Sequence, residues 1–142
     1  MKVKDVKTGE VHLVAHTKDR PKHHEPFTML FTKPVLDLLG ARTVKLTALD
    51  WRVLMFLFAS CDYGNKVGFL INDVATGAGG HRGDVSKSVK QLAAWGFLCR
   101  TGGRRGAEQH YLLNPELVCR GVTTQRQGAQ RTWRSLGAPR AW

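Results

Sequence analysis

Acidic residues are few in this sequence. It has 11 aspartates and glutamates against 22 lysines and arginines, which gives a formal net charge of +11. Such an excess of positive charge predicts a polyanionic partner, either a nucleic acid or an anionic membrane surface. No basic segment carries large apolar residues along one helical side, as a membrane-surface helix does. We therefore expect a nucleic acid partner and no membrane.

Long hydrophobic runs and cysteine are also scarce. No apolar run approaches the ~18 residues that cross a bilayer, and the segment from Met1 to Asp5 lacks the apolar core of a signal peptide. A cytoplasmic location is therefore expected. The three cysteines, Cys61, Cys99 and Cys119, are odd in number and widely separated. This spacing argues against disulfides and a zinc site, and predicts three small residues in the core or near the surface.

Signatures of catalysis are missing too. A rolling-circle nickase needs a catalytic tyrosine and a His-hydrophobe-His metal pair, and none of the six histidines has that spacing. The two tyrosines, Tyr63 and Tyr111, are expected in a turn and in a strand. The glycines from Gly77 to Gly80 are not followed by the Gly-Lys-Ser/Thr of a phosphate-binding loop. We expect a non-enzymatic protein with no cofactor and no metal.

The chain does contain enough apolar residues for a core. Hydrophobic residues make up 42% of its 142 residues, which predicts a folded α+β protein, mainly helical. We expect a β-hairpin and linker over residues 1–25, a central domain over 26–121 and an arginine-rich helix or arm over 122–142.

The first part of the chain predicts a hairpin and then a helix. Residues 2–16 alternate in polarity around a central Lys-Thr-Gly-Glu turn, which is typical of a β-hairpin. The segment from Phe27 to Leu39 predicts a helix that begins near Lys33 or is broken at Pro34, and Gly40 stops it. This apolar segment either caps the core or meets a second copy of the chain, so a homodimer is one expectation.

A second, strongly apolar helix is predicted to begin after Thr47. Thr47 and Asp50 have the spacing of a capping box, and the helix continues to Cys61. Because almost every residue after Arg52 is apolar, we expect burial on more than one face. The strand 67–70 follows it.

A short helix is predicted next. Asn72 is its expected cap, with Asp73 in its first turn. The glycines at 77, 79 and 80 predict a loose connection to the next helix.

The helix predicted from Arg82 to Trp95 has two unlike faces. Positions i, i+4 and i+7 place apolar residues on one side, namely Val85, Val89 and Leu92. At about 100° per residue, Lys87, Lys90 and Gln91 point away from that side. Gly96 is expected to end the helix in a left-handed conformation. The apolar side should dock on a core and leave the basic side for a partner.

A second hairpin follows this helix. The runs 97–101 and 108–113 predict two strands joined by a glycine-rich loop that holds Arg104 and Arg105. Adjacent arginines at a hairpin tip suit contacts with phosphates or with the minor groove.

The last part of the chain combines a helix signal with a basic tail. Asn114, Pro115 and Glu116 predict the start of a short helix that Gly121 ends. Residues 100–142 hold eight arginines against two glutamates. The tail predicts a helix over 125–136 that packs Trp133 on the body, with a disordered basic arm as the alternative.

The order of these elements resembles the winged helix-turn-helix superfamily. The segment from Lys87 to Leu98 looks like a signature that MarR-type regulators share. The segment from Tyr111 to Gly121, a strand that runs into an Asn-Pro helix, resembles the RepL family of plasmid replication initiators. The resemblance covers Leu46 to Gly121 and implies a protein that recognises origin DNA and recruits host replication proteins.

Charge and resemblance together predict a sequence-specific binder of double-stranded DNA, most simply a plasmid replication initiator. The helix would enter the major groove and the hairpin would touch the neighbouring backbone. The expected DNA-binding residues are Lys87, Lys90 and Gln91 at base edges, Arg82 and Ser86 near the backbone, Arg104 and Arg105 at phosphate or minor groove, and Arg126 and Arg131 in the tail. The alternative is a MarR-like or autoregulatory transcriptional regulator of the same fold.

Overall fold

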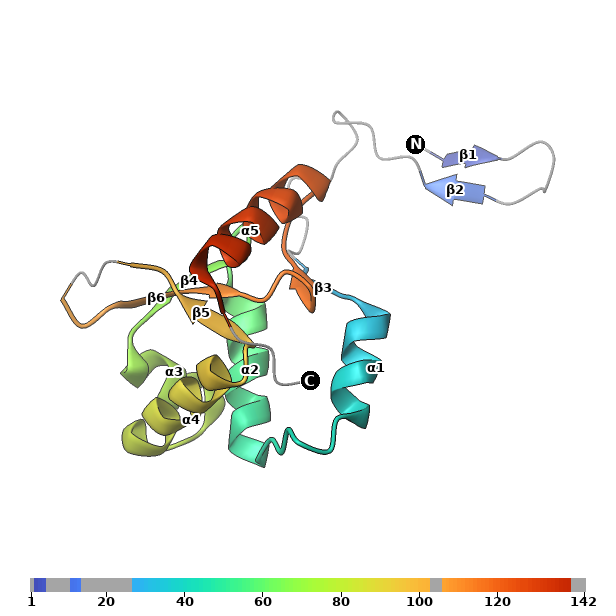
Figure 1. The fold of residues 1–142 in the computed structure, drawn as a ribbon. Helices are drawn as coiled ribbons and strands as arrows, with labels where there is room; N and C mark the ends of the chain where they lie inside the picture. Colours follow the sequence, from blue (N-terminus) through green and yellow to red (C-terminus); the bar gives the residue numbers. More distant parts are fainter. Residues whose placement is uncertain (1, 5–10, 14–26, 103–105, 139–142) are drawn as a thin grey trace.

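The computed structural model describes residues 2–4, 11–13, 27–102 and 106–138 of the chain. Within these residues the protein is α+β, with five helices and three small antiparallel sheets (Figure 1). None of these helices has the length and apolar character needed to span a lipid bilayer.

Helix α2 (Ala48–Ser60) forms the centre of the helical layer. The predicted capping box is confirmed: the Asp50 backbone N–H donates to Thr47 Oγ1 at 3.1 Å, and the Thr47 N–H donates to Asp50 Oδ2 at 2.9 Å. The helix buries one wide side, formed by Val53, Leu54, Leu57 and Phe58. The expected burial on more than one side is confirmed in part: Phe56 lies against Gly77, and Leu54 and Phe58 line a small cavity with Leu38 of the N-terminal segment, whereas Met55 is 45% exposed.

Helices α3 (Ile71–Ala78) and α4 (Arg82–Ala94) pack against α2. Asn72 is not the cap of α3, because Asn72 lies inside the helix, which begins at Ile71. Leu70 occupies the N-cap position and makes no side-chain capping bond. The Asn72 side chain is exposed instead. Asp73 lies in the first turn, as predicted.

The connection between α3 and α4 is tight, so the predicted loose link is wrong. Gly77 lies inside α3 against the ring of Phe56, where a Cβ would overlap the ring. Gly79 ends α3 with a φ of +75°. A Cβ on Gly80 would meet Leu49 Cδ1 at 2.8 Å. The missing Cβ at Gly77 and Gly80 lets α3 and its link to α4 approach α2 closely, so these glycines serve packing rather than mobility.

Strands β4 (Lys66–Phe69), β5 (Leu98–Arg100) and β6 (Gln109–Leu113) form an antiparallel sheet in the order β4-β6-β5. Because side chains alternate along a strand, the two faces of the sheet pack against different helices. Tyr111 and Leu113 join the core shared with α2, α3 and α4, whereas Leu112 packs with Ala129 and Trp133 of the last helix.

That last helix, α5 (Thr123–Leu136), confirms the predicted C-terminal helix. Its Trp133 is 9% exposed. In Figure 1, α5 lies above the sheet, and helices α2, α3 and α4 lie below it. The sheet therefore separates α5 from α4.

The N-terminal part adds two hairpin strands, a short strand and a helix. Strands β1 (Lys2–Lys4) and β2 (Val11–Leu13) pair antiparallel, which confirms the hairpin within the described residues. Helix α1 (Thr32–Gly40) starts one residue before Lys33 and holds Pro34 in its first turn, where proline is tolerated. Residues Met29–Leu30 form strand β3 rather than part of a helix.

The helix predicted after Asn114 is wrong. Asn114 Oδ1 accepts from the Glu116 N–H at 2.9 Å, but only one turn forms before strand β7 (Val118–Cys119) begins. Strand β7 pairs with β3, far away in the sequence. Buried Asn65 holds β7 in place, because its Nδ2 donates to Val118 O at 2.9 Å. Residues Val118–Cys119 thus pair with β3 instead of continuing the predicted helix.

Candidate nucleic-acid interface

Helix α4 has the two faces that its sequence predicts. Val85, Val89 and Leu92 are at most 1% exposed. On the other side Lys87, Lys90 and Gln91 are exposed. The buried side fixes the helix on the core, and the basic side is open to a partner.

A buried hydrogen bond fixes α4 on α2. Ser88 Oγ donates to Asp50 Oδ1 at 2.6 Å, and the two residues are 4% and 6% exposed. The other carboxylate oxygen of Asp50 closes the capping box of α2. Sequence analysis missed this contact, although Ser88 stands on the same helical side as Val85 and Leu92.

The C-terminal end of α4 is held by a buried asparagine. Gly96 ends the helix with a φ of +84°, as predicted. Asn114 Nδ2 donates to the Gly96 carbonyl at 2.9 Å, and the Asn114 N–H donates to the Phe97 carbonyl at 2.9 Å. Asn114 thus joins the end of β6 to the turn between α4 and β5, and fixes the hairpin beside α4.

The predicted hairpin is confirmed by the pairing of β5 with β6. Its tip residues Arg104 and Arg105 lie outside the described residues. Arg100, which sequence analysis did not single out, is exposed and follows buried Leu98 by two positions. By strand alternation Arg100 stands on the side of the sheet that faces α4.

Arg82 and Ser86 lie along one flank of α4. Arg82 is exposed and Ser86 is half-buried. Arg82 also lines a cleft with Asn72 at the start of α3 and Gln109 at the start of β6. The structure therefore brings Arg82 together with the loop end of strand β6.

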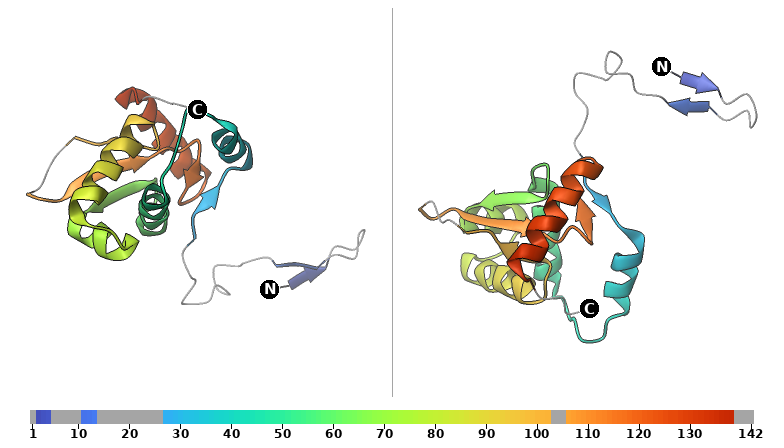
Figure 2. Two further views of the ribbon diagram at one scale, coloured as in Figure 1. Left: turned by 90° about the horizontal axis from the view of Figure 1, so that it is seen from below. Right: turned by 45° about the horizontal axis from the view of Figure 1, so that its top comes forward.

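Arg126 and Arg131 lie elsewhere. Both belong to α5, across the sheet from α4 (Figure 2). The Arg126 guanidinium lies 3.7 Å from the centre of the Phe31 ring, and its Nε donates to the Pro115 carbonyl at 3.2 Å. Arg126 thus packs within the protein, whereas Arg131 is exposed. The expected DNA-binding residues do not all share one face.

The cations of α4 have no acidic partners in the described part of the chain. The ion pairs there join Lys33 to Asp37 and His110 to Glu108. Neither pair involves Arg82, Lys87 or Lys90. Their charges are available to an external anion, with no internal ion pair to break first.

The cysteines behave as packing residues. Burial raises the pKa of the thiols of Cys61, Cys99 and Cys119, although a hydrogen bond with Thr28 acts in the opposite direction on Cys61. A raised pKa keeps a thiol protonated and unreactive near neutral pH. Among the described residues, no three His, Cys, Asp or Glu side chains gather closely enough to hold a metal ion.

The arrangement can therefore receive an extended anion on the exposed side of α4 and at the loop end of strand β6. No family model matches the chain, and neither a curated protein nor a solved structure matches it.

Proposed function

We propose that this protein binds double-stranded DNA as a winged helix-turn-helix, with α4 in the major groove and the β5–β6 hairpin along the adjacent backbone. The element order α2, β4, α3, α4, β5, β6 and the sheet order β4-β6-β5 support this fold. The observation that carries the proposal is the exposed side of α4, whose cations are unpaired within the described residues while its opposite side is buried.

The side chains on this face have the chemistry for reading base edges. Lysine donates to the O6 and N7 acceptors of guanine, and glutamine forms paired hydrogen bonds with adenine. Lys87, Lys90 and Gln91 therefore read sequence in this proposal. Arg82, beside the hairpin, and Arg100, in its strand β5, contact phosphates in this proposal. Phosphate contacts set the position of the protein on the duplex.

Initiation of plasmid replication is the role that we propose for this binding. It rests on the resemblance of the segment from Tyr111 to Gly121 to RepL-type initiators. The turn and strand that come after Asn114 depart from the Asn-Pro helix of that resemblance, so the support is a likeness in sequence. A transcriptional regulator would use the same groove-reading chemistry, and is the other outcome of the test below.

The test is binding to the DNA that flanks the protein's own gene, compared with a scrambled duplex of equal length and composition, over a series of salt concentrations. Specific binding predicts at least about a thousandfold preference for the native DNA. Equal affinity for both duplexes would overturn the specificity. A footprint then separates the roles, because protection of a repeated array supports replication and protection of a promoter supports regulation.

We also propose that the DNA-bound form is a homodimer, since paired winged helices match the two halves of a palindrome. The segment around β3 and α1 supports this, because Phe27, Leu30 and Leu39 are 63%, 52% and 64% exposed. Sedimentation of the full chain with and without duplex tests the proposal. A single protein copy on a palindromic site would contradict it.

A further inference from the structure

A cleft of about 340 Å³ lies between the starts of α3 and α4 and the loop end of strand β6. It is lined by Leu70, Ile71, Asn72, Arg82, Gly106, Ala107 and Gln109. Its size falls at the lower end of the range for small-ligand sites, about 300–1,000 Å³. These residues come from three separate segments, so the cleft exists only once the chain has folded.

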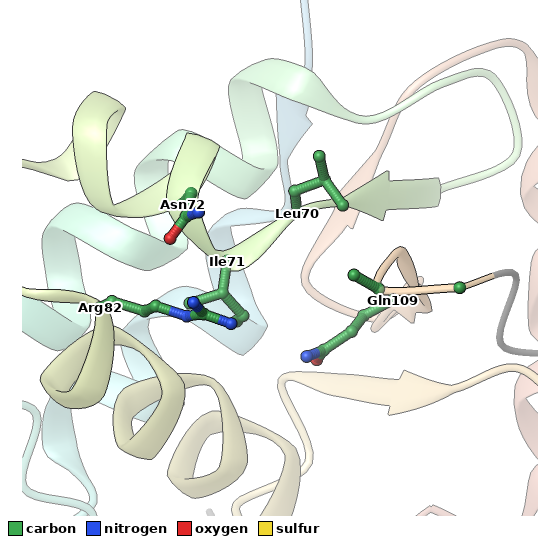
Figure 3. Close-up of a pocket in the computed structure, with 7 residues that line it drawn as sticks. Leu70, Ile71, Asn72, Arg82 and Gln109 are labelled. Atoms are coloured by element: carbon green, nitrogen blue, oxygen red, sulfur yellow. The ribbon is translucent and has the colours of Figure 1, made fainter.

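Polar side chains converge on this cleft from different elements. Figure 3 shows Arg82 and Gln109 reaching toward one another from opposite sides, with Asn72 above Arg82. Gln109 Oε1 accepts a hydrogen bond from the Tyr111 hydroxyl at 3.5 Å, which leaves its NH₂ group as a donor for the cleft. Within the described residues, the side chains of Arg82 and Asn72 have no hydrogen-bond or ion-pair partner.

Among the described residues, the rest of the lining is apolar and holds no carboxylate. Leu70, Ile71 and Ala107 provide the apolar walls. Asp73 and Asp84 lie in the first turns of α3 and α4, but neither lines the cleft. A guanidinium, two amides and apolar walls together suit an anion that carries an uncharged, partly apolar group.

We propose that this cleft binds one nucleotide unit, with its phosphate on Arg82, Asn72 and Gln109 and its sugar against Leu70 and Ala107. Guanidinium and amide N–H groups bind phosphate oxygens through charge-assisted hydrogen bonds. The phosphate ester comes either from the DNA backbone or from a free nucleotide, and these two sources share the same chemistry. The DNA source rests on the proposed function, whereas the free nucleotide does not depend on it.

Two isosteric variants test the cleft. Asn72→Asp and Gln109→Glu each place a carboxylate beside the phosphate without changing the size of the side chain, and they lie on different elements. Gln127→Glu is the matched control, because it adds the same charge at an exposed position of α5, across the sheet from α4. Thermal unfolding of each variant verifies folding. If one of the two cleft variants does not fold, the binding affinities of the other variant test the proposal.

The measurements are the affinity for a fluorescent 20-base-pair duplex, by anisotropy over a salt series, and the affinity for deoxyadenosine 5′-monophosphate and inorganic phosphate, by calorimetry. If the ligand is the DNA backbone, both cleft variants weaken duplex binding about tenfold and reduce the slope of log K against log salt by about 0.9. Gln127→Glu should stay within about twofold of the wild type.

The other outcomes are equally decisive. Binding of the free mononucleotide to the wild type, lost in both cleft variants while duplex affinity is unchanged, supports the cleft with a free nucleotide as its ligand. Cleft variants that match Gln127→Glu in both assays overturn the cleft proposal while DNA binding stands. A wild type that does not bind duplex overturns the proposed function, and the mononucleotide titration alone then decides the cleft.

Discussion

At the scale of single residues, a few buried polar side chains set the geometry around α4. Asp50 and Ser88 join α2 to α4, while Asn114 joins the end of β6 to the turn after α4. Each bond gives a partner to polar atoms that are buried. Leaving such an atom without a partner costs more free energy than an ordinary hydrogen bond contributes to stability. Periodicity places Val85, Val89 and Leu92 inside, but it does not identify the partner of a buried polar group, because that partner stands far away in the sequence.

Ser88→Ala tests the bond between the helices. The substitution leaves Asp50 Oδ1 buried without its donor, so we expect a loss of about 1–3 kcal/mol in the free energy of unfolding. Ser135→Ala is the control, since Ser135 donates to the Thr132 carbonyl from an exposed position of α5. Urea unfolding of both variants provides the measurement. Equal stability of the two would mean that the Ser88–Asp50 bond contributes little.

The buried thiol of Cys61 leads to a prediction about pH. Burial raises the pKa of this thiol above its ordinary value near 9, so the unfolded chain loses the proton first as the pH rises. The contribution to stability is therefore complete below about pH 9 and is lost as pH rises through the folded-state pKa, by at most about 1.4 kcal/mol per pH unit.

The measurement is the free energy of unfolding between pH 8 and pH 10.5 for the wild type and for Cys61→Ala. Because other groups titrate in this range, the difference between the two slopes is the relevant quantity. The variant should show the shallower fall. Parallel curves would mean that the thiol ionises equally in the folded and unfolded states.

At the scale of elements, local signals predict the first turn of a helix better than its continuation. The capping box at Thr47 marks the start of α2, and Gly96 marks the end of α4. Asn114 correctly predicts one turn, but strand β7 then pairs with β3 in place of a helix. Leu30 and Val118, which pair there, are 88 residues apart, so the sequence around Asn114 does not indicate this pairing. The short helix α3 starts without any capping side chain, so no local signal identifies its first residue.

The glycines between α3 and α4 show the same limit, because sequence alone does not distinguish a flexible link from a tight contact. Gly80→Ala would place a Cβ 2.8 Å from Leu49 and 3.2 Å from Val85. We expect a loss of about 1–3 kcal/mol in stability from this overpacking.

Gly83→Ala is the matched substitution one turn away. Gly83 lies in the first turn of α4, and nothing stands within 4 Å of its added Cβ. Because alanine favours a helix over glycine, this variant should gain up to about 1 kcal/mol. Thermal or urea unfolding of the pair should give effects of opposite sign. A gain in both variants would indicate a link that adjusts freely.

At the scale of the whole molecule, the sheet divides the basic residues between two faces. Strand alternation and the positions of α4 and α5 create this division, and neither the net charge nor the number of arginines predicts it. The sequence identified Lys87, Lys90 and Gln91 because they share one helix. It did not group Arg82 with Asn72 and Gln109, because three separate segments meet there only in the folded chain.

This division predicts unequal roles for the cations in DNA binding. Lys87 and Lys90 contact bases in the proposed complex, so Lys87→Gln or Lys90→Gln should weaken specific binding by about 1–3 kcal/mol. A reduction of about 0.9 in the slope of log K against log salt would indicate a phosphate contact instead. Arg131→Gln removes the same charge from α5 and should leave both quantities within error. Anisotropy titrations at four salt concentrations measure all three variants. An equal reduction for Arg131→Gln would place DNA on both sides of the sheet, which requires a duplex bent around the protein and contradicts a binding surface confined to α4 and the hairpin.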